Sequence, residues 1–260
     1  MIPSASITAW GIDRPWPTRS AIEQDLLLAR IIVEIFEHPL LAEELVFRGG
    51  TCLHQRHLAS PRRYSEDLDF VRRSNDGIGR VFDALREVSD AGGLEVYARD
   101  LAEHPKVRMR APSEGDSATM LRVKVEINTH ESSPSLPLLH LPFGVESGWF
   151  SGSTTVVTFA PEELVATKLR ALYQRKKGRD LFDLWLALVE MGLEPDAIVV
   201  AFEPYRPAGY TRETATRNLA AKVADRTFRT DLEALVIDWP DGYTVAEAST
   251  LVIERLISLL

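Results

Sequence analysis

The sequence has a single cysteine, Cys52, and lacks any long apolar run. One cysteine excludes a disulfide within the chain and a metal site built from several cysteines. No apolar run approaches the roughly 20 residues that a membrane-spanning helix needs. Residues 1–17 hold two tryptophans and three prolines, but no apolar segment typical of a signal peptide. These absences predict a cytoplasmic protein with no membrane partner.

Several enzyme motifs are missing as well. The chain has no Walker A loop, no Rossmann glycine fingerprint and no His-Glu-x-x-His zinc motif. The formal net charge of −8 argues against a dedicated nucleic-acid binder, because such proteins are usually basic. The length of 260 residues, 45% of them hydrophobic, suffices for one large or two modest domains.

Basic residues nevertheless gather in two segments of this acidic chain. They are Arg56, Arg62, Arg63, Arg72 and Arg73 in the first, and Arg175, Lys176, Lys177 and Arg179 in the second. Local positive charge on an acidic body suits a phosphate-rich substrate that is held at one end rather than along a long duplex.

The most informative segments are Phe47-Arg48-Gly49-Gly50-Thr51 and Arg63-Tyr64-Ser65-Glu66-Asp67-Leu68-Asp69-Phe70. They predict a strand, a Gly-Gly turn, a short helix, and then a strand that carries Asp-x-Asp. Side chains alternate along a strand, so Asp67 and Asp69 point to one face. Paired carboxylates favour Mg²⁺, and backbone N–H groups of the turn could bind phosphates. This pattern is typical of polymerase-beta-type nucleotidyltransferases.

Hydrophobic periodicity predicts an α/β half followed by a helical half. Expected strands cover residues 45–47, 67–71, 94–97, 107–109, 120–128 and 154–159. Expected helices cover residues 18–38, 51–58, 79–89, 161–176, 179–191, 196–202, 211–224, 229–236 and 245–260. Residues 112–117 are predicted to form a polar turn, and residues 132–153, rich in Ser, Pro and Gly, a long loop. The shift in composition predicts two lobes, residues 1–160 and 161–260.

Two further charged residues stand out by their positions. Glu126 lies on the polar face of the strand over residues 120–128, where it could complete a metal site or act as a general base. Alternatively it forms an ion pair with Lys124, Arg122 or another charge. Lys168 shares a helix face with Leu164 and Leu172, where a lysine needs a negative partner such as a triphosphate. Alternatively, the Lys168 side chain extends along the helix edge so that its ammonium group reaches solvent.

The run from Arg175 to Asp183 offers phosphate-binding groups, or simply a solvated charged turn. Asp180 falls in the first turn of a helix, where the dipole favours a carboxylate, and it could pair with Arg179 or Arg175. Asp183 could pair with Arg179. Ser65 is either a phosphate contact, a modification target or a turn cap. His54 and His57, and buried Cys52, are interpreted as structural.

Together these motifs resemble the AbiEii/AbiGii toxin family, nucleotidyltransferase-like toxins of toxin–antitoxin and phage-defence systems that include the MenT toxins. The resemblance extends from about Arg48 to Trp185. It rests on Arg48-Gly49-Gly50-Thr51, on the segment from Arg63 to Phe70, on Lys124-Val125-Glu126-Ile127, on Lys168-Leu169-Arg170-Ala171-Leu172, and on the run from Arg175 to Trp185. Four motifs in one order are specific, whereas Gly-Gly or Asp-x-Asp alone is not.

The resemblance implies a polymerase-beta-like nucleotidyltransferase core with a helical C-terminal lobe that contributes a lysine and an aspartate to the site. It implies Mg²⁺, or Mn²⁺, bound by Asp67 and Asp69, with Gly50 and Thr51 orienting the triphosphate and with Lys168 and Asp180 as further catalytic residues. From their positions in the sequence, Glu126 is expected as a third metal ligand and catalytic residue, and Gly49, Ser65, Arg175 and Arg179 as further phosphate contacts. The expected acceptor is the 3′ end of tRNA, and the expected partner is a cognate antitoxin. A protein acceptor, or a non-catalytic nucleotide-binding protein, remains an alternative.

Overall fold

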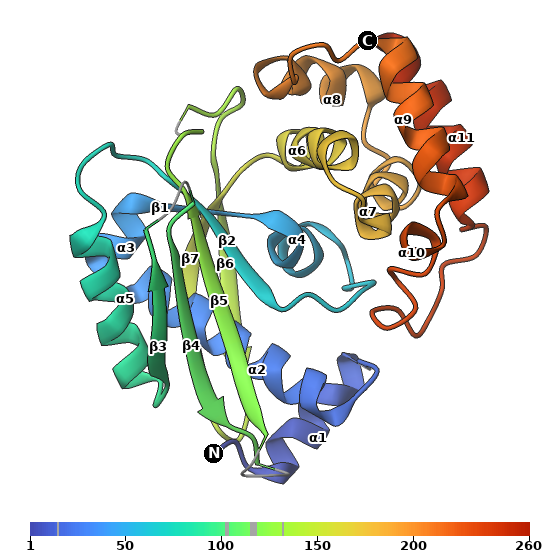
Figure 1. The fold of residues 1–260 in the computed structure, drawn as a ribbon. Coiled ribbons are helices and arrows are strands. Elements are labelled where there is room, and N and C mark those ends of the chain that lie inside the picture. Colours follow the sequence, from blue (N-terminus) through green and yellow to red (C-terminus); the bar gives the residue numbers. More distant parts are fainter. Residues whose placement is uncertain (15, 102–103, 115–118, 132) are drawn as a thin grey trace. The chain divides into compact units, whose positions relative to one another are not determined.

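The computed structural model describes residues 1–14, 16–101, 104–114, 119–131 and 133–260. The chain divides into two compact units (Figure 1). The first comprises Met1–Pro134 and Leu138–Phe159, and the second comprises Ser135–Pro137 and Ala160–Leu260. The first unit contains all the strands among the described residues, and the second is helical. The predicted mixed α/β fold is therefore confirmed.

Strands of the first unit form one sheet with the order β3-β4-β5-β2-β1-β7-β6. Its members are β1 (Leu45–Arg48), β2 (Asp67–Arg72), β3 (Glu95–Asp100), β4 (Lys106–Pro112), β5 (Met120–Asn128), β6 (Leu139–Glu146) and β7 (Ser151–Thr158). The pairs β2–β5 and β1–β7 are parallel, and the other neighbours are antiparallel. Segments far apart in the sequence, β2 and β5, thus become direct neighbours at the centre of the sheet.

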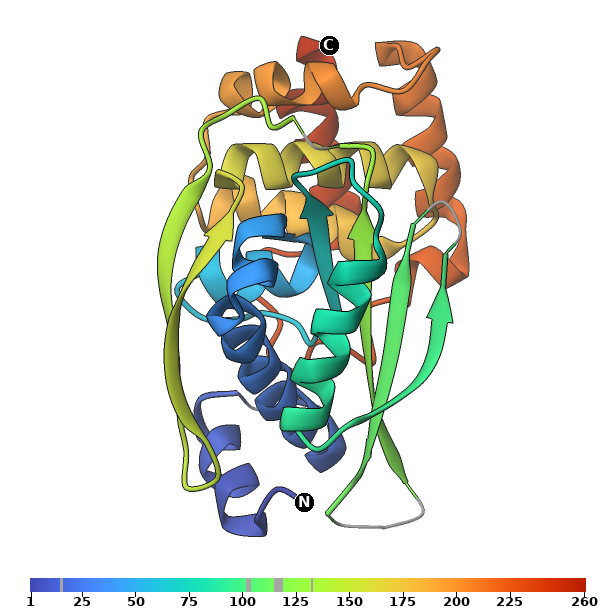
Figure 2. The same cartoon turned by 90° about the vertical axis from the view of Figure 1, so that its left-hand side faces the viewer.

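The first unit contains five helices among its described residues. They are α1 (Ser4–Asp13), α2 (Arg19–Glu37), α3 (Pro39–Glu44), α4 (Gly49–Cys52) and α5 (Gly79–Ala91), with a π-helical turn, η1 (Leu53–His57), after α4. The hydroxyl of Thr18 accepts a hydrogen bond from the Ala21 N–H at the start of α2. Figure 2 shows α2 and α5 side by side. Both contact the sheet, whose strands β4 and β5 turn alternate apolar residues inward; among them Val107, Met109, Val123 and Val125 are at most 1% exposed.

The loop predicted over residues 132–153 is wrong, because β6 and the start of β7 lie within it. Pro142 and Gly144 make β6 resemble a loop in sequence. However, β6 is an edge strand, where a proline that cannot donate a hydrogen bond is tolerated. The long antiparallel pairing of β6 with β7 supplies the register that local sequence does not indicate. Of the predicted turn over residues 112–117, positions 115–117 lie outside the described residues.

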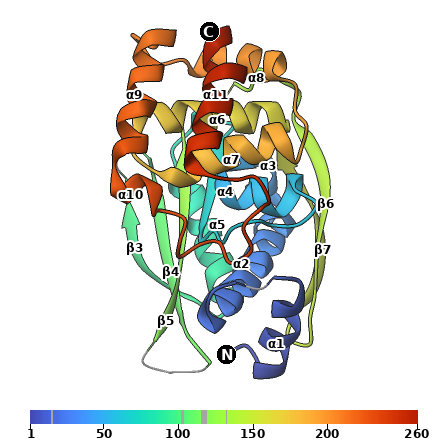
Figure 3. The same cartoon turned by 90° about the vertical axis from the view of Figure 1, so that its right-hand side faces the viewer.

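The second unit packs helices α6 (Pro161–Gln174), α7 (Gly178–Val189), α8 (Pro195–Phe202), α9 (Arg212–Ala224), α10 (Arg226–Arg229) and α11 (Val245–Arg255), with short 3₁₀ turns η2 (Glu203–Tyr205) and η3 (Ile257–Leu259) (Figure 3). Buried Glu163 on α6 organises one end of the unit. Its carboxylate accepts hydrogen bonds from the N–H groups of Ser135 and Leu136 and from the Tyr205 hydroxyl. These bonds explain why Ser135–Pro137 belongs with the helices.

The helix predicted over residues 229–236 is also wrong, since α10 covers only Arg226–Arg229. The Asp225 carboxylate accepts a hydrogen bond from the Phe228 N–H, which begins the helix earlier than its apolar spacing indicates. Turns follow Arg229 instead of a continued helix. In the described part of the chain, no helix combines the length and apolar character needed to cross a membrane.

His57, at the end of η1, gives the fold a predicted pH dependence. Burial, assisted by the charge of Arg56, lowers the pKa of His57 from 6.5 to about 4. The unfolded chain therefore binds more protons than the folded chain between these values, and stability is lost as the pH falls from 6.5 toward 4. Urea unfolding across this range should show the decline, and it should be shallower in His57→Gln. An equal slope in both proteins would contradict this assignment.

Candidate active site

The Asp-x-Asp pair lies on the polar face of the sheet at its centre. Asp67 and Asp69 of β2 point to this face, while the intervening Leu68 is fully buried on the other. In the parallel register of β2 and β5, Asp69 lies opposite Glu126 and Asp67 lies opposite Lys124. Directly opposite residues share a face of the sheet. The strand register therefore aligns, on one face of adjacent strands, the three carboxylates that the sequence suggested as metal ligands.

The Gly-Gly turn packs directly against Asp69. Gly49 begins α4 and adopts φ +80°, a left-handed conformation that glycine tolerates best. A Cβ atom at Gly49 would overlap Asp69 Oδ2. A Cβ at Gly50 would lie 2.5 Å from the Arg63 guanidinium and 3.2 Å from Ser65 Oγ. Both glycines are thus required by close approach. The first N–H groups of a helix have no partner within that helix.

Gly49→Ala is expected to damage both stability and the site. The left-handed backbone and the clash with Asp69 should lower the free energy of unfolding by about 1–3 kcal/mol and displace the carboxylate. Gly93→Ala is a matched control, because Gly93 has φ +71° but its Cβ would meet no atom within 4 Å. Urea unfolding and Mn²⁺ titration should show a loss of metal affinity in Gly49→Ala alone. Equal metal affinity in both variants would contradict the role given to Gly49.

Thr51 ties the start of α4 to the Asp-x-Asp strand. Its Oγ1 lies 2.5 Å from the backbone carbonyl oxygen of Asp67 and 2.9 Å from Ser65 Oγ. Thr51 is only 1% exposed, whereas Ser65 is half-buried. The Thr51 hydroxyl therefore has a structural partner already, and it fixes the position of Asp67 relative to the glycine turn.

Lys124 is a member of the site that sequence reasoning considered only as an alternative partner for Glu126. Its Nζ lies 2.8 Å from Asp67 Oδ2 and 3.4 Å from Glu126 Oε2. Burial alone would lower the pKa of Lys124, but the hydrogen bond to Asp67 and the charges of Asp67, Glu126 and Asp69 outweigh it and raise the pKa. The signal in the sequence is its position two residues before Glu126, on the same face of one strand.

The oxygens of these carboxylates are the kind of ligand that a hard divalent cation prefers. Among the described residues, no three histidine, cysteine or carboxylate side chains are arranged closely enough to hold a metal ion. However, the Lys124 ammonium group contacts two of the three carboxylates, so these oxygens already hold a cation. Asp67 and Asp69 with Glu126 supply the oxygen ligands that Mg²⁺ or Mn²⁺ prefers.

Lys168 lies in the second unit and is buried there, at 6% exposure. Its Nζ lies 2.9 Å from Asp183 Oδ2 and 3.9 Å from Asp180 Oδ1, and both aspartates are fully buried on α7. The negative partner expected for this lysine is thus present within the protein. Asp183 faces α6, which explains why it reaches Lys168 on that helix.

The basic run before α7 is held by aspartates as well. Arg175 makes two hydrogen bonds of 2.7 Å to Asp180, in the bidentate form that favours guanidinium–carboxylate pairs. Arg179 lies 3.6 Å from Asp231, which also accepts the Arg179 backbone N–H. A phosphate group would therefore compete with Asp180 for Arg175 and with Asp231 for Arg179.

The fold and the carboxylates with their glycine turn define the class of nucleotidyltransferases, and solved structures agree on the fold. MenT4, a nucleotidyltransferase toxin from Mycobacterium tuberculosis H37Rv, is similar with a TM-score of 0.68 at 19% identity, covering 100% of this chain and 91% of the other. JHP933 from Helicobacter pylori has a TM-score of 0.57 at 18% identity, and the alignment covers 93% of this chain and 92% of that one. A putative nucleotidyltransferase from H. pylori has a TM-score of 0.52 at 18% identity, and the alignment covers 94% of this chain and 99% of that one.

Residues 30–248 match the family described as nucleotidyl transferase AbiEii toxin, type IV toxin–antitoxin system. The match covers most of the chain, so this protein belongs to that family and is a nucleotidyltransferase of a toxin–antitoxin system. The family resemblance indicated by the sequence motifs is confirmed. No curated protein matches the sequence.

Proposed function

We propose that the protein transfers a nucleotide from a nucleoside triphosphate to the 3′ end of tRNA in a reaction that depends on Mg²⁺, and thereby blocks translation. One observation carries this proposal: Asp69 lies opposite Glu126 on the adjacent strand, and the glycine turn packs on Asp69. Family membership supports nucleotide transfer and implies an antitoxin partner. The tRNA acceptor is inferred from the family resemblance of the motifs, Mg²⁺ from that resemblance and from the paired carboxylates, and a cytoplasmic location from the features that the sequence lacks.

Asp67, Asp69 and Glu126 would hold the metal, and Mn²⁺ would serve in place of Mg²⁺. When bound, the metal would supply stabilisation of negative charge on the reacting phosphates and the leaving pyrophosphate. Asp69 or Glu126, which lie opposite each other on adjacent strands, would accept the proton of the attacking hydroxyl. Lys124 would release Asp67 as the metal binds and remain beside Glu126.

The phosphates would be bound by the backbone of Gly49 and Gly50, with Thr51 and Ser65 orienting that turn. Lys168 and Asp180 are proposed as further catalytic residues, and Arg175 and Arg179 as phosphate ligands, on the strength of the family motifs. For these assignments, the phosphates of a substrate would have to replace the aspartates that pair with Lys168, Arg175 and Arg179.

The direct test is incubation with each labelled nucleoside triphosphate, Mg²⁺, total tRNA and total protein, beside the Asp67→Ala variant. Label on tRNA that depends on Asp67 supports the proposal. Removal of metal by EDTA should abolish transfer, and Mg²⁺ or Mn²⁺ should restore it. Label on protein would instead support a protein acceptor. Nucleotide binding without transfer to either acceptor would support the non-catalytic alternative.

A further inference from the structure

The polar face of β4 and β5 carries a row of basic residues, of which the chemistry above uses only Lys124. We call it the basic strip; it comprises Lys106, Arg108 and Arg110 on β4, and Arg122 and Lys124 on β5. The antiparallel register sets Arg108 opposite Lys124 and Arg110 opposite Arg122. Two like-charged pairs therefore lie side by side across adjacent strands, beginning next to the β2 carboxylates.

Like charges directly opposite each other destabilise a sheet. Acidic neighbours relieve part of this cost, since Glu95 pairs with Arg110, and Glu126 contacts both Lys106 and Lys124. Arg108 and Arg122, by contrast, form no ion pair with any acidic side chain in the portion that the structure describes. Two guanidinium groups without acidic partners, on a chain of net charge −8, call for an anionic ligand.

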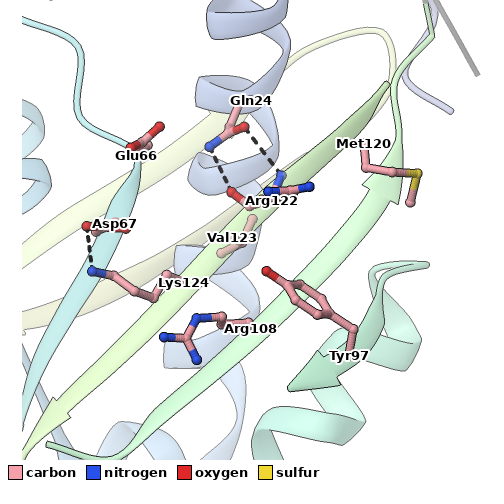
Figure 4. A pocket seen from close by; sticks show the side chains of 9 residues that line it. All are labelled: Gln24, Glu66, Asp67, Tyr97, Arg108, Met120, Arg122, Val123 and Lys124. Carbon is pink, nitrogen blue, oxygen red and sulfur yellow. Dashed lines mark hydrogen bonds and ion pairs between the residues drawn. The ribbon is translucent and has the colours of Figure 1, made fainter. Parts of the chain in front are cut away.

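A hollow of about 430 Å³ lies over this part of the strip (Figure 4). It forms because β2 begins at Asp67, opposite Lys124, and leaves the preceding part of β5 without a neighbour on that side. There the Gln24 side-chain amide of α2 takes the place of a neighbouring strand. The Arg122 carbonyl oxygen accepts a hydrogen bond from the Gln24 amide NH₂, and the Arg122 N–H donates one to the Gln24 amide oxygen. Asp67, Lys124, Arg108 and Arg122 all line this hollow, so it opens directly beside a proposed metal ligand.

Tyr97 closes the hollow at the edge strand. Its side chain is 40% exposed and lines the hollow together with Arg108 (Figure 4). The pairing of β3 with β4 shifts between Val96 and Ala98, which places Tyr97 at an irregularity that can re-aim its side chain. An exposed aromatic ring beside arginines is the combination that binds single-stranded nucleic acid, through base stacking and phosphate contacts.

We propose that this hollow and the basic strip bind the single-stranded end of an RNA acceptor, which rests on the proposed function. Arg108 and Arg122 would contact backbone phosphates, and Tyr97 would stack on a base. The terminal hydroxyl would lie toward Asp67. Strands β5 and β4 separate β2 from β3, so this path crosses three strand spacings, about 14 Å. That length suits a short unpaired end.

The test is equilibrium binding of a labelled single-stranded RNA oligonucleotide by fluorescence anisotropy, in EDTA and without nucleotide. The double variant Arg108→Gln/Arg122→Gln should raise the Kd at least about tenfold at low salt. It should also reduce the slope of log K against log salt by about 0.7 for each phosphate that the protein no longer neutralises. Tyr97→Leu should raise the Kd about 5- to 100-fold with an unchanged slope. Arg80→Gln, at an exposed arginine on α5, controls for a single arginine-to-glutamine change elsewhere on the surface and should bind normally.

The outcomes separate this inference from the proposed function. If the double variant and the wild type bind RNA with the same Kd and the same salt dependence, the inference is overturned. It is also overturned if an acidic peptide displaces the RNA and itself binds more tightly, because the surface would then be a protein interface. If the strip binds RNA as expected but no nucleotide is transferred to any acceptor, the proposed function fails while the RNA site stands.

Discussion

Replacing Asp67 with asparagine should reduce nucleotide transfer by at least about 10³-fold, because the metal is expected to contribute several kcal/mol to transition-state stabilisation. Asp67 points to the polar face of the sheet and already contacts a cation, the Lys124 ammonium group. The isosteric amide keeps the shape of the side chain but removes the charge that binds a divalent ion. The rate is measured with labelled triphosphate and a saturating acceptor.

The same substitution should change stability little. Asp67 is 39% exposed in its side chain, and Lys124 keeps Glu126 as a partner, so the free energy of unfolding should fall by no more than about 1 kcal/mol. Asp83→Asn on α5 is a matched control, since Asp83 is an exposed carboxylate paired with Arg86. If Asp67→Asn transferred nucleotide at more than about a tenth of the wild-type rate, Asp67 would not be an essential metal ligand.

Asp183→Leu should destabilise the second unit by about 3–5 kcal/mol, because it removes the nearest partner of a buried lysine. Lys168 is only 6% exposed and cannot regain water without moving from the core face of α6. Its remaining neighbour Asp180 is farther away, at 3.9 Å, and is shared with Arg175. Chemical denaturation followed by circular dichroism measures the decrease in stability.

The double variant Lys168→Met/Asp183→Leu separates folding from catalysis. Replacing both members of a buried ion pair by apolar residues is often neutral, so this protein should recover most of the stability of the wild type. If Lys168 is catalytic, the recovered protein should still fail to transfer nucleotide. A stable double variant with normal transfer would show that Lys168 serves the fold alone. Asp196→Leu, at an exposed position of α8, controls for the aspartate-to-leucine change elsewhere.

The spacing of apolar residues predicted much of the fold, because it reflects which side chains of a helix or strand are buried. The alternation over residues 120–128 matches β5 at both ends, and the apolar spacing after Thr18 matches α2 within one residue. Prediction failed where partners distant in the sequence decide the structure. Strand β6 contains Pro142 and Gly144 and forms because β7 pairs with it at the edge. Helix α3 begins at Pro39, directly after the predicted end of the helix over residues 18–38, and was not predicted.

The candidate site shows the same division. The spacing of Asp67 and Asp69 predicted two carboxylates on one face, because side chains of a strand alternate. It could not predict that Lys124 lies opposite Asp67, since that depends on the parallel register of strands more than fifty residues apart in the chain. Likewise, only α6 packing on α7 shows that Asp183 is the close partner of Lys168.

The sequence by itself determined the family, the motifs and the mixed α/β class, because these depend on residue types and on local periodicity. Tertiary structure decided which charges meet. It placed a lysine between carboxylates, packed Gly49 against Asp69, and aligned Arg108 with Lys124 beside a hollow. The physical reason is that strand register and helix packing are fixed by burial of the apolar face, and the polar side chains on the opposite face are positioned as a consequence.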